Sequence, residues 1–208
     1  MRGISKEGAK SSSRRIILAS ASPRRVELLA LVCPGFDVIP STFDESGLAE
    51  DLSPTDHVAA SAAGKARGVA ASVKDGLVIG ADTVVVIDEH MLGKPVDEED
   101  AARMLRLLSG RVHQVYTGIH VVDVSLDERR ERSGIECTDV RVRKLTERMI
   151  ERYVATGEPL DKAGAYAIQG RGSVLIEGIS GCFFNVVGLP IYRLSLILEE
   201  FGMEVFGC

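Results

Sequence analysis

A strand that leads directly into a helix is encoded by residues 15–32, whose sequence is RIILASASPRRVELLALV. Residues 15–19 form a short apolar run, which predicts a buried strand. Ser22 is a residue type favoured at a helix N-cap, and Pro23 suits the first helical position, so a helix is predicted through residues 26–32. A strand followed at once by a helix is the expected beginning of an α/β protein.

Strands and helices continue to alternate along the chain. Apolar and β-branched runs predict strands at residues 36–40, 77–88, 112–124 and 134–142, and a short strand at the C-terminus. Helices are predicted after Ser53 to Val73, after Asp97 to Ser109, after Thr146 to Val154, and from about Leu189 to Phe201. Because some neighbouring strands form hairpins, the predicted fold is α/β with a mixed, twisted sheet flanked by helices.

Length and composition narrow the class of protein. The 208 residues are 45% hydrophobic and 26% charged, which predicts one globular domain over residues 14–208, whereas the small, polar and basic residues 1–13 predict a disordered tail. A net charge of −5 argues against a nucleic-acid-binding surface. No run suits a membrane helix or a signal peptide, so we expect a cytoplasmic protein with reduced cysteines and neither membrane nor nucleic-acid partners.

An anion-binding site is predicted at residues 20–25, SASPRR. The free N–H groups of the helix start, the hydroxyls of Ser20 and Ser22 and the guanidinium groups of Arg24 and Arg25 would converge there. These donors and the helix dipole complement the distributed negative charge of a phosphate. The alternative is a capped helix with solvated arginines, and this segment alone does not separate the two.

Asp82 is a carboxylate within the apolar run of residues 77–88. Because an unpaired carboxylate is costly to bury, we expect Asp82 at the end of the strand, in contact with a cation, a metal ion or hydrogen-bond donors. Facing a phosphate pocket, it would hold Mg²⁺ or orient a water molecule. The alternative is an Asp turn after Gly80 and Ala81.

Other charged residues are ambiguous when taken singly. Lys94, between a glycine and a proline, would suit a transferred phosphate, but an isolated Gly-Lys-Pro is also an ordinary loop. Asp44 and Glu45 lie in an acidic loop that is solvated unless it closes over a metal ion. Lys65 lies on an Ala-rich helix, where a lysine is usually solvated.

A glycine-rich segment surrounds Lys162 and Gln169. Small neighbours allow a ligand to approach the backbone closely, and the amide of Gln169 offers a donor and an acceptor to the edge of a nucleobase. The alternative is a simple turn. The histidines lie apart from any Ser or Cys nucleophile pattern, so packing or surface roles are predicted for His57, His90, His113 and His120.

Six ordered motifs resemble the Maf family of nucleoside triphosphate pyrophosphatases. They are SASPRR (20–25), GADT (80–83), GKP (93–95), YTG (116–118), PLDKAGAYAIQG (159–170) and NVVGLP (185–190). The resemblance runs from about Ile16 to the C-terminal helix. It implies a fold related to the inosine triphosphate pyrophosphatases, two lobes around a central groove, frequent homodimers and a divalent metal cofactor, Mg²⁺ or Mn²⁺.

The resemblance also implies a reaction and a substrate class. A nucleoside triphosphate would be cleaved between its α and β phosphates, giving the monophosphate and pyrophosphate. Arg24, Thr83 and Gln169 resemble the branch that prefers dTTP and UTP, whereas a sister branch that acts on 7-methyl-GTP differs at these positions. These three residues are therefore the expected specificity determinants.

Roles for individual residues follow from the motifs and the resemblance together. Asp82, Lys94 and Arg25 are the expected catalytic residues, with Asp82 as proton acceptor, and Asp82 and Glu45 are the expected metal ligands. Which carboxylate acts as base and which binds the metal stays open. The expected phosphate-binding residues are polar or basic: Ser20, Ser22, Arg24, Arg25, Lys65, Lys94 and Lys162.

Two other functions also fit the sequence. Maf proteins are associated with inhibition of septum formation, so the chain could act in cell division by binding another protein. It could also be a broader house-cleaning enzyme for non-standard nucleotides, including modified pyrimidine triphosphates.

Overall fold

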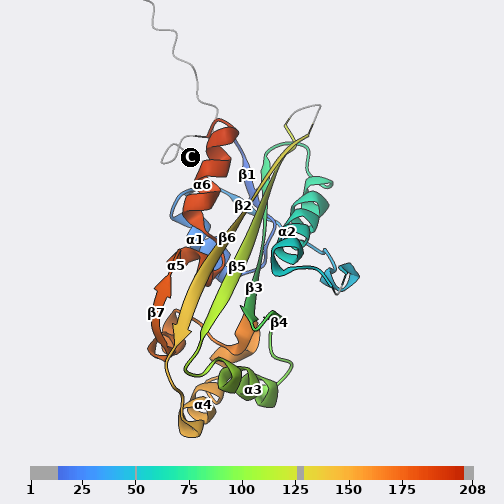
Figure 1. Cartoon of the computed structure of the whole chain (residues 1–208). Helices are drawn as coiled ribbons and strands as arrows, with labels where there is room; N and C mark the ends of the chain where they lie inside the picture. Colours follow the sequence, from blue (N-terminus) through green and yellow to red (C-terminus); the bar gives the residue numbers. More distant parts are fainter. Residues whose placement is uncertain (1–13, 50, 126–128, 204–208) are drawn as a thin grey trace, which may run out of the picture.

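A seven-stranded mixed sheet organises the computed structural model, which describes residues 14–49, 51–125 and 129–203 (Figure 1). The strands are β1 (Ile16–Leu18), β2 (Asp37–Val38), β3 (Leu77–Ile87), β4 (His90–Leu92), β5 (Val112–Asp123), β6 (Arg130–Val142) and β7 (Ile176–Ser180). Their order is β2-β1-β3-β5-β6-β7, and β4 pairs with β3. The β1 pairings with β2 and β3 are parallel and the other pairings are antiparallel, which confirms the predicted mixed sheet.

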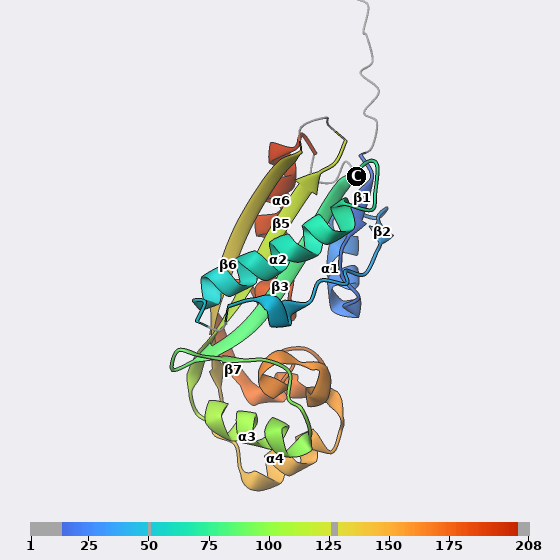
Figure 2. The ribbon, with the colours of Figure 1, turned by 90° about the vertical axis from the view of Figure 1, so that its right-hand side faces the viewer.

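Helices cover both faces of this sheet. They are α1 (Pro23–Ala30), α2 (Pro54–Ala70), α3 (Glu98–Leu108), α4 (Glu147–Val154), α5 (Phe183–Val187) and α6 (Ile191–Glu200), with short 3-10 turns η1 (Glu45–Gly47), η2 (Glu158–Asp161), η3 (Ala163–Ala165) and η4 (Gly170–Leu175). Helix α2 crosses one face, α1 and α6 lie on the other, and α3 and α4 lie at one end of the long strands (Figure 2). None of the helices in the described ranges is long and apolar enough to cross a membrane.

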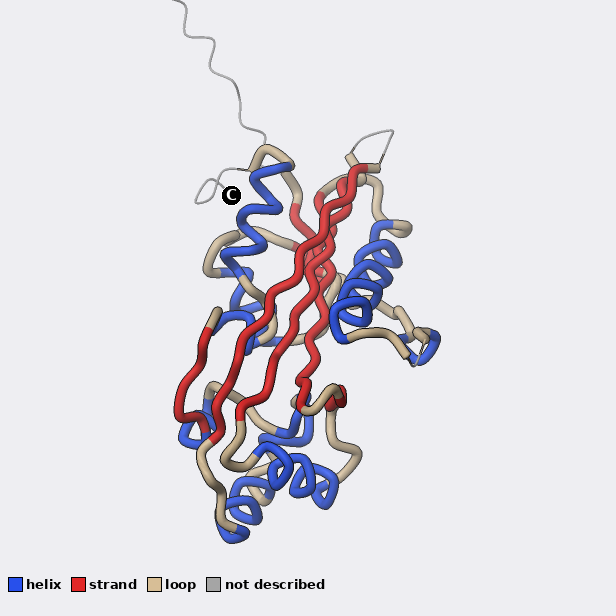
Figure 3. The backbone as a smooth tube through the Cα atoms, in the orientation of Figure 1, coloured by secondary structure: helices blue, strands red, loops and turns tan. Residues whose placement is uncertain are grey.

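Two large hydrophobic cores correspond to the two lobes. One contains Leu29 of α1, Ile79 of β3 and Leu194 of α6, and the other contains Leu105 of α3 and Ile150 of α4. The long strands β3, β5 and β6 run from one lobe into the other (Figure 3). Side chains near the junction of the lobes therefore come from segments that are far apart in the sequence.

Two glycines let α2 lie close to the sheet. A Cβ at Gly80 of β3 would lie 2.3 Å from the carbonyl oxygen of Ala62, and a Cβ at Gly118 of β5 would lie 2.4 Å from that of Val58. Any larger residue at either position would push the helix away. This close approach brings the side chains of α2 within reach of the middle of β3.

Most predicted element starts are confirmed, and several ends are wrong. The side chains of Ser53, Asp97 and Thr146 cap α2, α3 and α4 as predicted. Helix α1 stops at Ala30 rather than residue 32, and Leu31 is its C-cap.

Boundaries of other elements also differ from the prediction. Helix α2 ends at residue 70 rather than 73, the second strand shortens to residues 37–38, and β6 begins at Arg130 rather than 134. The longer β6 is supported by Arg132, whose Nε donates to Glu200 Oε2 at 2.6 Å. The predicted N-terminal tail and C-terminal strand (204–208) lie outside the described residues.

Candidate active site

Two adjoining cavities lie between the lobes, and both are lined by Arg25, Thr83, Lys94 and Ala163. The first, of about 190 Å³, is also lined by Ser22, Pro23, Arg24, Val85, Val115, Asp161, Lys162, Tyr166, Val186, Val187 and Gly188. The second, of about 470 Å³, is also lined by Glu45, His57, Lys65, Asp82, Val84, Met91 and Gly93. The second cavity therefore carries the paired carboxylates of Glu45 and Asp82, whereas the first combines four basic side chains and Asp161 with apolar walls.

The structure corrects the predicted position of Asp82. It lies in the middle of β3, opposite Gly118 of β5, rather than at a strand end, and it is only 7% exposed. Strand β1 pairs with residues 77–79 and β4 with residues 85–87, so neither covers this part of the β3 edge. The carboxylate is tolerated here because Lys65 supplies an opposite charge.

The ammonium group of Lys65 lies between two carboxylates. Its Nζ donates to Asp82 Oδ1 at 2.7 Å and lies 2.5 Å from Glu45 Oε1, and its side chain is mostly buried. Sequence reasoning predicted a phosphate-binding lysine. In the structure the ammonium group of Lys65 contacts the carboxylates of Asp82 and Glu45. Lys65 therefore neutralises and orients these two side chains.

Local packing fixes the loop that carries Glu45. Phe43 occupies the space beside α2 that Gly64 leaves free, since a Cβ at position 64 would lie 2.3 Å from the ring. The backbone N–H of Ser46 donates to Asp44 Oδ1 at 2.9 Å, and this hydrogen bond lowers the pKa of Asp44. Asp44 therefore shapes the turn, and Glu45 reaches the cavity.

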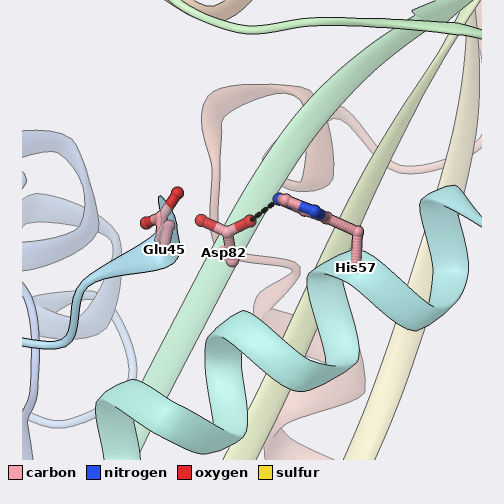
Figure 4. A group of neighbouring side chains, drawn as sticks. All are labelled: Glu45, His57 and Asp82. Carbon is pink, nitrogen blue, oxygen red and sulfur yellow. Dashed lines mark ion pairs between the residues drawn. The ribbon is translucent and has the colours of Figure 1, made fainter. Parts of the chain in front are cut away.

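His57 joins the carboxylates from α2, and its Nε2 lies 3.9 Å from Asp82 Oδ2 (Figure 4). The predicted packing or surface role did not anticipate this position. A signal exists in the sequence: His57 and Lys65 are separated by slightly more than two helical turns, which places them on one side of α2.

The donor set fits a divalent cation. One ligand atom from each of Glu45, His57 and Asp82 lies within 4.8 Å of the others. Asp82 Oδ2 is buried and has no hydrogen-bond partner among the described residues, which is costly for a carboxylate oxygen. Carboxylate oxygens and imidazole nitrogens are common ligands of divalent ions.

Arg25 is held by the protein's own acceptors. Its guanidinium donates to the carbonyl oxygens of Gly188 at 2.9 Å and Ala81 at 2.8 Å, and to Thr83 Oγ1 at 3.1 Å. Ala81 is next to Asp82 in the part of the β3 edge that no described strand covers. The hydrogen bond from Arg25 to Ala81 therefore takes the place of one that a neighbouring strand would make. Burial lowers the pKa of Arg25, and the nearby Asp82 carboxylate opposes this shift.

The rest of the predicted anion segment lies partly at the first cavity: Ser22 and Arg24 line it, whereas Ser20 lines neither cavity. Ser22 is the N-cap of α1 without a side-chain capping bond, and it lines the first cavity. The buried Ser20 hydroxyl accepts from the Ser22 backbone N–H at 3.2 Å. Among the described residues, the one ion pair of Arg24 is with Asp161 at 3.8 Å, which leaves donors for a ligand.

Two lysines from later segments complete the basic lining. Exposed Lys94 lines both cavities, whereas Lys162 lines the first and contacts Asp161. The backbone N–H of Gly164 donates to the carbonyl oxygen of Gly93 at 3.0 Å. This hydrogen bond joins the segment that carries Lys162 to the segment that carries Lys94. The structure therefore brings Lys94 and Lys162 to the same cavity, as expected.

Gln169 is not brought into either cavity. It is exposed and precedes η4, outside the lining described above. Glu158 fixes the next residues, because its carboxylate accepts from the backbone N–H groups of Arg171 at 3.0 Å and Gly172 at 2.8 Å. These backbone bonds lower the pKa of Glu158 against the opposing effect of its burial.

Tyr166 is a cavity residue to which sequence reasoning assigned no role. It is 6% exposed, and its hydroxyl lies 2.8 Å from Nε2 of His113. Burial raises the pKa of Tyr166 and lowers that of His113 to about 4, so both groups are neutral near pH 7. The packing role predicted for His113 agrees with this position.

Known proteins resemble this chain over most of its length. The sequence model of the Maf-like protein family matches residues 15–201 of this chain. A dTTP/UTP pyrophosphatase from Moorella thermoacetica is 52% identical over 195 residues, which cover 93% of this chain and 98% of that protein. A dTTP/UTP pyrophosphatase from Methanosarcina mazei is 50% identical over 194 residues, which cover 93% of this chain and 97% of that protein.

A solved structure resembles the fold. A HAM1 protein from Coxiella burnetii has a TM-score of 0.50 and 15% sequence identity, and the match covers 90% of this chain and 99% of that one. This likeness concerns the fold alone, and it agrees with the predicted α/β class. The sequence matches, which extend along nearly the whole chain, show that the chain belongs to the Maf-like protein family.

Proposed function

We propose that this protein hydrolyses dTTP and UTP, and modified pyrimidine triphosphates of similar shape, to the nucleoside monophosphate and pyrophosphate. One observation carries the proposal. The chain is 52% identical to a protein named dTTP/UTP pyrophosphatase, and the match covers 98% of that protein. A paired-carboxylate cavity that adjoins a basic one supports it independently.

The triphosphate binds among the basic side chains that line the first cavity. Arg24, Lys94 and Lys162 offer charged donors to phosphate oxygens. Arg24 and Lys162 share the exposed carboxylate of Asp161, whereas three acceptors hold the guanidinium of Arg25. Ser22 adds a hydroxyl at the start of α1. Arg25 supports this binding by holding α1, β3 and the segment at Gly188 together.

Asp82 is the proton acceptor for the attacking water. Its ion pair with Lys65 stabilises the charged carboxylate, and Oδ2 is available to accept a hydrogen bond. Glu45 and Asp82 hold a divalent cation, Mg²⁺ or Mn²⁺. When bound, that cation neutralises charge on the phosphates and on the leaving pyrophosphate.

Base choice is assigned to Arg24, Thr83 and Gln169. Thr83 lines both cavities, and its hydroxyl is fixed by Arg25 and by Thr117 Oγ1 at 2.9 Å. Gln169 lies outside the lining, so it contacts a base only if the segment before η4 moves toward the bound nucleotide.

Pyrophosphate release from a panel of triphosphates with Mg²⁺ tests the function. The panel contains dTTP, UTP, 5-methyl-UTP, CTP, dITP, GTP and 7-methyl-GTP. Fastest turnover of dTTP and UTP supports the proposal. Turnover restricted to 7-methyl-GTP or dITP, or none in a folded protein, contradicts it.

A further inference from the structure

His57 faces a buried oxygen that has no partner. Among the described residues, Asp82 Oδ2 is the one buried carboxylate oxygen without a hydrogen bond, and the imidazole of His57 points toward it (Figure 4). The separation of 3.9 Å from Nε2 is too long for a hydrogen bond. The contact therefore does not satisfy the oxygen.

The same separation suits two ligands of one ion. Ligand atoms about 2.1 Å from a cation lie roughly 3 to 4 Å from each other. Glu45 offers a third ligand atom within 4.8 Å of the other two, and it lies in the short turn η1. The three residues thus surround one position.

The charges around this position also favour a cation. Lys65 contacts Oδ1 of Asp82 and Oε1 of Glu45, which leaves one oxygen of each carboxylate. Two carboxylates and one ammonium group carry a net charge of −1, and an imidazole binds metal in its neutral form. A divalent ion would reverse that charge and thereby attract a polyphosphate.

We infer that His57 is a nitrogen ligand of the divalent cation and makes this site prefer Mn²⁺ or Co²⁺ over Mg²⁺. The inference rests on the proposed function in one respect, since that function places a cation beside Glu45 and Asp82. Mg²⁺ prefers oxygen ligands, whereas affinity for first-row transition ions rises when imidazole joins the ligand set. His57 is thus a selectivity residue as well as a ligand.

Calorimetric titration of the metal-free full chain with Mn²⁺ and with Mg²⁺, without nucleotide, tests this role. His57→Gln is compared with the wild type and with His90→Gln, which removes an exposed histidine on β4. We expect His57→Gln to weaken Mn²⁺ binding about tenfold or more and Mg²⁺ binding less than about threefold. Equal effects on the two ions, or no effect on Mn²⁺, would overturn the inference.

Two measurements on the wild-type protein guard against a folding defect in the variant. In a sample with ¹⁵N-labelled histidine, traces of Mn²⁺ should broaden the imidazole signals of His57 before those of His90. Simultaneous broadening of both would contradict the inference. Pyrophosphate release is assayed in the same preparation: tight Mn²⁺ binding at His57 without any triphosphate turnover supports the ligand role and contradicts only the proposed function.

Discussion

Nζ of Lys65 lies 2.7 Å from Oδ1 of Asp82, although the two residues are 17 positions apart and belong to a helix and a strand. The same ammonium group lies 2.5 Å from Glu45. All three charged groups line the same cavity between the lobes. Because they are partly shielded from water there, the ammonium group and the two carboxylates stabilise one another. The first two predictions concern this arrangement.

Asp82→Asn preserves the shape of the side chain and removes its charge. We expect pyrophosphate release from dTTP to fall about a hundredfold or more, because a general base contributes roughly 10² to 10⁴ in rate. Initial rates with Mg²⁺ measure the effect, and thermal unfolding verifies the fold. Asp139→Asn on β6, outside both cavities, is the matched control and should keep the wild-type rate. Near wild-type turnover in Asp82→Asn would exclude the catalytic role.

Lys65→Met removes the cation shared by Asp82 and Glu45. In the presence of EDTA the free energy of unfolding should fall by about 2 to 4 kcal/mol, since a mostly buried charge loses its partner. Millimolar Mg²⁺ should restore part of this loss by replacing the ammonium group. Urea unfolding with and without Mg²⁺ measures both effects, and exposed Lys74→Met is the control. The same loss in both conditions would argue against a cation site beside Lys65.

Arg25→Lys keeps the charge and loses the planar fork. We expect the free energy of unfolding to fall by roughly 2 kcal/mol, because hydrogen bonds to Ala81, Thr83 and Gly188 cannot all be kept. Arg24→Lys should change stability by less than about 0.5 kcal/mol while raising KM for dTTP, since Arg24 has only a long ion pair. Urea unfolding and steady-state kinetics of both variants provide the comparison. Equal destabilisation by both substitutions would refute the supporting role of Arg25.

Gln169→Glu replaces an amide that donates and accepts with a carboxylate that only accepts. If Gln169 contacts the base, the ratio of kcat/KM for UTP to that for CTP should fall about tenfold, because a carboxylate prefers the amino group of cytosine. Val174→Glu adds the same charge to the same 3-10 segment at an exposed position and should leave the ratio unchanged. An unaltered substrate ranking in Gln169→Glu would remove this residue from base recognition.

His113 should make the protein less stable in acid. Burial lowers its pKa from the ordinary 6.5 to about 4, so between these values only the unfolded chain takes up the proton. The neutral, buried imidazole therefore contributes roughly 3 kcal/mol to the free energy of unfolding. This contribution is fully present above about pH 6.5 and is lost progressively as the pH falls toward about 4.

His113→Gln should consequently show a smaller difference in unfolding free energy between pH 7 and pH 4.5 than the wild type. Urea unfolding at the two pH values measures this difference. His90→Gln, which replaces an exposed histidine on strand β4, is the control and should keep the wild-type pH dependence. An unchanged pH dependence in His113→Gln would show that another group is responsible.

Local sequence signals predicted the elements and much of the basic lining. Ser53, Asp97 and Thr146 cap helices where expected, since a cap depends on donors only a few residues away. Residues 22–25 lie between a strand and a helix and at the start of that helix, so their place beside the cavities followed from the strand–helix pattern. The family resemblance also rested on short motifs, of which residues 20–25 are one.

Tertiary structure alone decided how the carboxylates are partnered. Asp82 was expected at a strand end, yet the registers of β1 and β4 leave the middle of β3 uncovered, and that is where it lies. His57 received a packing or surface role because its meeting with Asp82 requires α2 to approach β3 across Gly80. The sequence by itself therefore determined the elements and the identity of the chemical groups. Strand register and helix approach decided which groups meet, because both are set by the packing of segments distant in the chain.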